Sequence, residues 1–354
     1  MDHTMSGQAL HAPAVHDAQV KRMSLALQGG GAHGAYTWGV IDRLMEEKRL
    51  EIEGVSGTSA GAMNAAVFAD GMGRGGRDEA RASLDRFWHN IADAGRYSPF
   101  QPTPFDRLTK GWNLDHSVTF LAFDAMSRLM SPYQINPLNF NPLRDVLVKS
   151  IDFKRLEGCR AVKLFISATN VRSGKVRVFK SGEMTPEVLL ASACLPFLFQ
   201  AVEIEGDPYW DGGYMGNPSI FPLIYDCTAS DVMIVQVNPL SCDEVPRTAN
   251  AIMNRMNEIS FNSTLMREMR AISFVTDLVD EGKLDAGQYR RMNMHWIDAE
   301  AEMKGLGVSS KLNSNIDFLL HLKDIGRRAA DAWLAANFDK IGKVSTVDIK
   351  AKFL

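Results

Sequence analysis

The sequence predicts an α/β protein with a mostly parallel sheet. Two short apolar runs, 23–27 and 51–56, are each followed by a glycine-rich turn and then by a segment with helical spacing. This repeated order of strand, turn and helix is typical of parallel α/β sheets. Of the 28 glycines, 12 lie between Gly29 and Gly76, which indicates that the two turns need unusual backbone conformations or close backbone approach.

The rest of the chain continues this pattern after an insertion. Helices are predicted over 35–48, 62–69, 78–93 and 186–193, and strands over 162–169, 176–180, 202–204, 209–210 and 232–237. The glycines from Gly71 to Gly76 predict a flexible break between two of these helices. Residues 97–143 are rich in proline and aromatic side chains, and we expect them to cap one end of the sheet. From Thr248 onward the spacing is mostly helical, which predicts a C-terminal extension over 241–354 that packs on the rest.

Composition limits the classes of protein that remain. With 354 residues, 45% of them hydrophobic, the chain can form two domains or one large α/β domain, and global disorder is excluded. The net charge of −3 argues against a protein that binds nucleic acid by neutralising phosphates. The four cysteines are scattered and show no CxxC spacing, so we expect reduced thiols, no metal site and a cytoplasmic protein.

The N-terminal residues 1–21 are expected to form a flexible tail. They mix histidines and acids with small residues and lack the basic and apolar regions of a secretory signal. A metal-binding use of His3, His11 and His16 is a minor alternative. The chain contains no uninterrupted apolar run of roughly 18 residues, so no membrane-spanning helix is predicted.

The turn after the second apolar run carries a candidate nucleophile. Gly57-x-Ser59-x-Gly61 lies between a predicted strand and a predicted helix. On such a tight turn the serine Oγ projects at the end of the sheet, beside the N-terminus of the helix. The alternative is an ordinary turn in which Ser59 only caps the helix.

The turn after the first apolar run, Gly29-Gly30-Gly31-x-x-Gly34, offers unobstructed backbone amides at a helix start. Such amides suit a phosphate or a developing oxyanion. The same glycines match the dinucleotide-binding pattern G-x-G-x-x-G, which needs an acid at the end of the next strand. Glu51 and Glu53 lie at the beginning of that strand instead, so the dinucleotide reading is disfavoured.

A third motif follows much later in the chain. Asp211-Gly212-Gly213 comes directly after a short predicted strand, and its two glycines permit a sharp turn beside the carboxylate. Taken alone, this is an ordinary Asp-Gly turn.

Together, and in this order, the three motifs resemble those of the patatin-like phospholipase family over residues 22–240. The stretch 191–199 and Asn217-Pro218 are also similar to the family. The resemblance implies a three-layer α/β/α sheet in which Ser59 is the nucleophile and Asp211 the general base of a dyad without histidine. It also implies an oxyanion hole of backbone amides and a set of motif glycines. The oxyanion donors would be Gly29, Gly30, Gly31 and Ala60, and the motif glycines Gly34, Gly57, Gly61, Gly212 and Gly213.

Histidines mark one departure and one alternative. His33 stands where the family often has Arg or Lys, which puts an anion-holding role of that position in doubt. His295 and His321 follow Asp211 in the order of a conventional Ser-Asp-His triad. We favour packed or surface histidines for both, because the triple-glycine loop does not belong to that class of hydrolase.

The sequence therefore predicts a serine hydrolase of lipid carboxyl esters, without cofactor or metal. The alternatives are a lipid- or acyl-binding regulator with little turnover and, more remotely, a nucleotide-binding oxidoreductase. A lipid or acyl-ester substrate is the expected partner, no nucleic acid is expected, and the oligomeric state is open. Peripheral contact with the inner membrane surface is also open, since apolar stripes at 251–279 and 315–338 fit packing on the sheet better than a lipid surface. The aromatic segment 97–143 is the better candidate for a lid or an acyl-chain wall.

Overall fold

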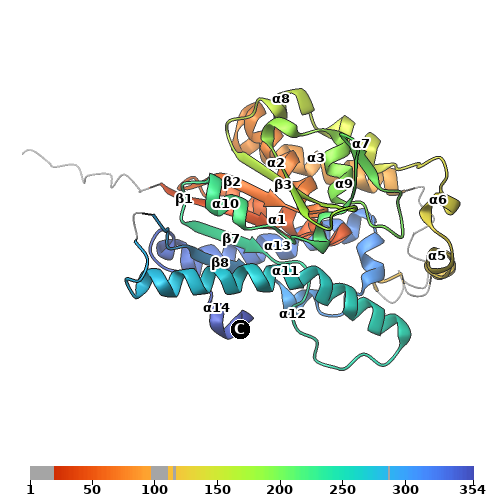
Figure 1. The fold of residues 1–354 in the computed structure, drawn as a ribbon. Helices are drawn as coiled ribbons and strands as arrows, with labels where there is room; N and C mark the ends of the chain where they lie inside the picture. The colour runs from red at the N-terminus through yellow and green to blue at the C-terminus, as the bar shows by residue number, and fades with distance from the viewer. Residues whose placement is uncertain (1–19, 97–110, 115–116, 286–287) are drawn as a thin grey trace, which may run out of the picture.

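The computed structural model describes residues 20–96, 111–114, 117–285 and 288–354. Its centre is a sheet with the strand order β5-β6-β3-β2-β1-β7-β8, and β4 pairs with β3 (Figure 1). The strands are β1 (Lys21–Leu27), β2 (Leu50–Gly57), β3 (Lys163–Asn170), β4 (Val176–Lys180), β5 (Val202–Ile204), β6 (Asp207–Asp211), β7 (Asp231–Val235) and β8 (Asn293–Ile297). The ladders between β1, β2, β3, β7 and β8 are parallel, whereas those formed by β4, β5 and β6 are antiparallel. The predicted α/β fold is confirmed, with a parallel centre and one antiparallel end.

Helices cover both faces of this sheet. The longer ones are α1 (Gly34–Glu46), α2 (Ala60–Gly75), α3 (Arg77–Gly95), α5 (Val118–Leu129), α7 (Leu143–Ser150), α11 (Ala249–Asp280) and α13 (Ile316–Asn337). The shorter ones are α6 (Pro132–Ile135), α8 (Phe153–Glu157), α9 (Pro186–Ser192), α10 (Phe221–Asp226), α12 (Glu300–Met303) and α14 (Ile349–Phe353). Single 3₁₀ turns are η1 (Gly31–His33), η2 (Ser181–Glu183), η3 (Gly212–Tyr214), η4 (Val308–Leu312) and η5 (Phe338–Lys340).

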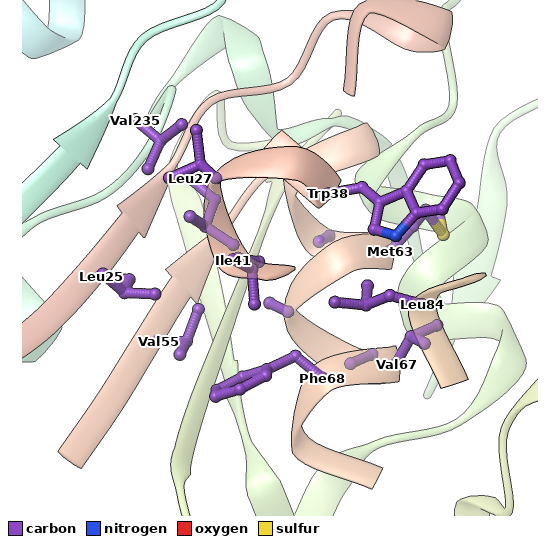
Figure 2. Close-up of a cluster of buried hydrophobic side chains, with 14 of the residues drawn as sticks. Leu25, Leu27, Trp38, Ile41, Val55, Met63, Val67, Phe68, Leu84 and Val235 are labelled. Carbon is purple, nitrogen blue, oxygen red and sulfur yellow. The ribbon is translucent and has the colours of Figure 1, made fainter. Parts of the chain in front are cut away.

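The period of two along each strand divides the core into two layers. Leu25 and Leu27 of β1 face the larger cluster, which is completed by α1, α2, α3 and α13, whereas Ala26 faces the smaller one. Figure 2 shows Leu25 and Leu27 beside Ile41 of α1 and Phe68 of α2. The smaller cluster holds side chains of α10, α11 and α14, and α11 runs below the sheet in Figure 1 while α2 and α3 lie above it. The fold is thus the expected three-layer α/β/α arrangement, and burial of both faces explains the continuously apolar strands.

The strand register brings three turns to one edge of the sheet. Leu27 of β1 is paired with Gly57 of β2 and with Val235 of β7, so these three strands end together. The segments that follow them therefore meet at the carboxyl ends of the strands, where parallel α/β sheets place their sites. β6 runs antiparallel along the end of β3 and pairs Asp211 with Ala168 at the same edge.

The interpretation of Gly71 to Gly76 as a break is wrong, because α2 continues to Gly75. A Cβ atom at Gly71 would lie 2.4 Å from the Ala80 Cα, so α3 packs directly against this position. Close packing of two helices therefore outweighs the low helix propensity of glycine here.

The C-terminal third is more closely built into the sheet than its helical spacing suggested. β8 pairs with β7 and extends the sheet by one strand. α13 lies against α1, where a Cβ atom at Gly39 would lie 1.9 Å from the Lys323 carbonyl oxygen. α11 packs only its second half on the sheet: Leu265 and Met269 are fully buried.

Two expectations concern the ends of the molecule. The first strand begins at Lys21, one residue before the expected limit of the tail, and residues 1–19 with their histidines lie outside the described part. The expected cap is described only at 111–114 and 117–143, where α5 and α6 lie at one end of the molecule (Figure 1). No helix within the described ranges is long and apolar enough to cross a membrane.

Candidate active site

Ser59 lies at the turn between β2 and α2 in a conformation that residues other than glycine rarely adopt. Its φ of 55° and ψ of −123° place it in the strained region found at nucleophile turns. The flanking glycines make the turn possible, because a Cβ atom at Gly61 would lie 2.2 Å from the Leu27 carbonyl oxygen. The amide of Ser59 donates to Ser192 Oγ at 3.0 Å, which holds the turn from the end of α9.

Asp211 lies at the end of β6 beside this serine. It is 1% exposed, it accepts a hydrogen bond from the Gly213 amide at 2.7 Å, and the Ser59 side chain lies beside it. Burial raises the pKa of Asp211 to about 7, although the Gly213 amide and the Ser59 side chain act in the opposite direction. A Cβ atom at Gly212 would lie 3.0 Å from Thr58 Cγ2, so this glycine allows β6 to approach the Ser59 turn.

The glycine loop after β1 lies against the same serine. A Cβ atom at Gly29 would lie 2.7 Å from the Ser59 Cβ, and Gly31 has a φ of +59°, which favours glycine. Among the described residues, no protein acceptor binds the backbone amides of Gly30, Gly31 and Ala60. These three amides are therefore free to bind an anion next to Ser59.

The expectation that Gly29 also donates to an oxyanion needs correction. Its amide donates to Asn217 Oδ1 at 2.7 Å, so this donor is already used. Its carbonyl oxygen accepts from Asn238 Nδ2, also at 2.7 Å. Two asparagines from distant parts of the chain thus hold Gly29 from both sides, and its role is to shape the loop.

His33 carries no charge in this site. Burial, together with the nearby Lys311, lowers the pKa of His33 to about 3, and its Nε2 is bound to Ser310 Oγ at 2.7 Å. Lys311 of η4 lies beside the loop, where burial lowers the pKa of its amine, and its Nζ donates to Asn238 Oδ1 at 2.7 Å. The family often has Arg or Lys at the position of His33 in this loop. Here a lysine of the C-terminal extension, Lys311, lies next to the loop instead.

The sequence predicted the candidate reacting groups but missed the residues that hold them. Ser192 and Asn217 lie in or near stretches that were noted only as similar to the family, and Asn238 and Lys311 carried no signal. Their roles depend on contacts across more than a hundred residues of chain. A single sequence does not encode such contacts in any local pattern.

The two later histidines have other partners. His295 on β8 is buried, with Nε2 2.7 Å from Asp231 Oδ1 and Nδ1 3.1 Å from Thr346 Oγ1. His321 is exposed on α13 and stacks on Trp112 at 5.6 Å. Both fit the packed and surface roles that the sequence favoured.

Glu51 and Glu53, the acids considered for a dinucleotide site, have other partners. Glu53 accepts from Thr228 and Ala229, and Glu51 pairs with Arg22, all at the beginning of the strands and away from the glycine loop. Within the ranges that the structure describes, no three His, Cys, Asp or Glu side chains gather where they could hold a metal ion.

A strained serine turn, a buried carboxylate beside it and free backbone amides at the carboxyl edge of a parallel sheet are features typical of α/β serine hydrolases. The model of the patatin-like phospholipase family matches residues 25–224, and the chain belongs to this family. It is therefore a member of a family of lipid acyl hydrolases. No curated protein sequence matches the chain.

Two solved structures show remote similarity. The crystal structure of VipD from Legionella pneumophila is 16% identical, with a TM-score of 0.37, and the match covers 94% of this chain and 73% of that one. The type III effector protein ExoU is 14% identical, with a TM-score of 0.33, and the match covers 89% of this chain but only 53% of that one. The family assignment rests on the sequence match.

Proposed function

We propose that this protein hydrolyses carboxyl esters of lipids, phospholipids included, with Ser59 as the nucleophile and Asp211 as the general base. The observation that carries the proposal is the buried carboxylate of Asp211 beside the side chain of Ser59, which lies on a strained turn. A serine hydroxyl reacts with an ester only when a neighbouring base takes its proton. No histidine is needed if the carboxylate itself is basic enough.

Burial makes Asp211 such a base. A carboxylate in water has a pKa near 4 and is a poor acceptor for a hydroxyl proton. With a pKa of about 7, Asp211 is about half ionised at pH 7 and binds a proton more strongly than a carboxylate in water does. As Ser59 Oγ attacks the ester carbonyl carbon, the hydroxyl proton passes to Asp211.

The amides of Gly30, Gly31 and Ala60 form the proposed oxyanion hole. The negative charge that develops on the ester carbonyl oxygen is bound by these donors and by the N-terminal end of α2. Each donor of this kind contributes roughly 3–4 kcal/mol to the stability of the transition state. Collapse of the intermediate expels the alcohol, which takes the proton from Asp211.

The second half of the reaction repeats these roles with water. A water molecule attacks the acyl group on Ser59, and Asp211 accepts its proton. The oxyanion donors again bind the charge, and the fatty acid leaves as Ser59 regains its proton. We propose that residues 22–240 supply all reacting groups and that 241–354 support them through α13 and Lys311.

The test compares the wild-type protein with Ser59→Ala. We expect the wild type to hydrolyse p-nitrophenyl acyl esters and phospholipids and to be labelled by a fluorophosphonate. Ser59→Ala should lose both properties, with a rate reduced by at least about a thousandfold. A wild type that binds lipid but is neither labelled nor active would support the regulator instead. Equal activity of the variant would refute the proposed nucleophile.

A further inference from the structure

Two uncharged segments of the chain border the proposed site. Residues 129–143 and 193–202 contain no Asp, Glu, Lys or Arg, although 23% of the whole chain is charged. The first segment includes α6 and the turn after it, and the second connects α9 to β5. A protein surface that faces only water is normally interspersed with charges.

Hydrogen bonds join the two segments to each other and to the dyad. Gln200 Nε2 donates to the Asn136 carbonyl oxygen at 2.8 Å, and the Ala201 amide donates to the Tyr133 hydroxyl at 3.3 Å. At the other end of the second segment, the Asp211 amide donates to the Cys194 carbonyl oxygen at 2.8 Å. The uncharged surface therefore adjoins the carboxyl edge of the sheet, where Ser59 lies.

Large apolar side chains stand out from this surface. The exposed ones are Leu129, Met130, Tyr133, Leu138, Phe140 and Phe197, and we call this set the apolar rim. Leu138 is 91% exposed and Phe140 70% exposed.

The turn that carries the most exposed of them is held in place. The Asn136 side chain donates to the Phe140 carbonyl oxygen and accepts from the Phe140 amide, both at 2.9 Å. Among the residues that the structure describes, this ordered turn presents Leu138 to the outside. An exposed apolar patch of this kind marks an interaction site.

The chemistry of the rim favours a lipid surface without net charge. Transfer of leucine, methionine and phenylalanine side chains from water to the acyl region is favourable, and tyrosine is enriched at the level of the headgroups. The two segments themselves contain no cation that can attract anionic headgroups. Two arginines flank the first segment in the sequence, Arg128 before it and Arg144 after it, and Arg144 is paired with Glu187 at 2.7 Å. A lipid ester that enters the site beside the rim would pass into it directly from the lipid surface.

We propose that the apolar rim docks on the surface of zwitterionic or neutral lipid and so holds the Ser59 edge against its substrate. This inference rests on the proposed function, because it assigns the way in which a lipid ester reaches that site. Docking is driven by apolar burial, so it depends little on salt.

The experiment measures binding to phosphatidylcholine vesicles by cosedimentation, with Ser59→Ala as the background so that the vesicles stay intact. Leu138→Glu with Phe140→Glu places two charges on the rim, and Leu138→Asn with Phe140→Asn removes the apolar side chains without adding charge. The control is Tyr225→Glu on α10, which is 79% exposed. α10 ends at Asp226, whose carbonyl oxygen binds Lys163 at the beginning of β3, so this control lies at the opposite edge of the sheet.

We expect both double variants to bind vesicles at least about a hundredfold more weakly, since each of the two apolar side chains contributes at least about a tenfold factor. Tyr225→Glu should bind as the background does, and binding should change little between low and high salt. On the active background, hydrolysis of a soluble short-chain ester should stay unchanged in all variants.

Other outcomes overturn the proposal. Unchanged vesicle binding of the double variants, or an equal loss in Tyr225→Glu, would do so. A double variant that turns a dimer into a monomer without changing vesicle binding would show that the rim joins two copies of this chain. Failure of the proposed function is distinguishable, because an inactive wild type whose vesicle binding still depends on the rim would leave the docking surface standing.

Discussion

Asp211 is buried and Glu268 is half-buried, and the two carboxyl groups have a similarly raised pKa and different neighbours. Burial raises the pKa of each to about 7, and backbone amides act in the opposite direction in both. Asp211 additionally faces the hydroxyl of Ser59. Glu268 on α11 accepts from the amides of Ile220 and Phe221 at 2.8 and 2.9 Å, where α10 begins.

The comparison shows that a raised pKa alone does not identify a catalytic base. Both carboxyl groups are poised to titrate near neutral pH, but only Asp211 has a hydroxyl proton to accept. Glu268 binds the free amides at a helix start, which is a structural role. The neighbouring group, rather than the pKa, separates catalysis from support.

The largest expected effect tests this separation directly. Asp211→Asn removes the base and should lower kcat/KM for an acyl ester by at least about a thousandfold. Glu268→Gln keeps an oxygen that accepts from both amides and should stay within about twofold of the wild type. Steady-state kinetics with a soluble ester measures both, and similar losses in the two variants would contradict the assignment.

The pH dependence of activity should follow Asp211 alone. The base must be ionised, so kcat/KM should rise with pH, reach a plateau above about pH 7 and lie roughly a hundredfold lower at pH 5. Glu268→Gln should show the same profile. A profile that is flat between pH 5 and 8 would mean that the base titrates elsewhere.

Stability should depend on both groups in the same way. Because each folded pKa lies above the unfolded value near 4, the folded protein binds more protons, and the free energy of unfolding falls as pH rises from about 4 to 7. In Asp211→Asn and in Glu268→Gln, the fall in the free energy of unfolding between pH 4 and 7 should be smaller than in the wild type by up to about 3 kcal/mol. Denaturant unfolding should therefore show both variants to be more stable than the wild type at pH 8 and similar to it at pH 4. If only one of the two variants were more stable at pH 8, the two carboxyl groups would not share a raised pKa.

The smallest effect concerns the residues that hold the glycine loop. Asn238→Ala removes the donor to the Gly29 carbonyl oxygen and the acceptor of Lys311, and it should lower kcat by about tenfold through loss of loop position. The matched control is Asn293→Ala, which changes another buried asparagine. The Asn293 side chain donates to Asp231 Oδ2 at 3.3 Å at the beginning of β7, the end of the strand away from Asn238. The control should change stability without changing kcat. Equal kcat values for the two variants would argue that Asn238 has no special role.

Much of the fold was predictable because its signals are local. The strand at 23–27, the strand at 51–56 and the glycines after each are readable from spacing and from the conformations that such turns require. The prediction of a break at Gly71 was wrong for the opposite reason, because no residue near that glycine in the sequence indicates that α3 packs on it. β8 was missed for a similar reason: its short segment gains its identity as a strand by pairing with β7.

The amino-acid sequence by itself determined the three motifs of the proposed site and their order, because a serine turn, a glycine loop and an Asp-Gly-Gly turn are each defined by a few adjacent residues. The tertiary structure decided which backbone amides stay free and how basic the carboxylate is. Asn217 takes the Gly29 amide from 188 residues away, and the pKa of Asp211 depends on how completely the surrounding chain excludes water. Both properties arise from contacts between distant segments, and these form only when the whole sheet is assembled.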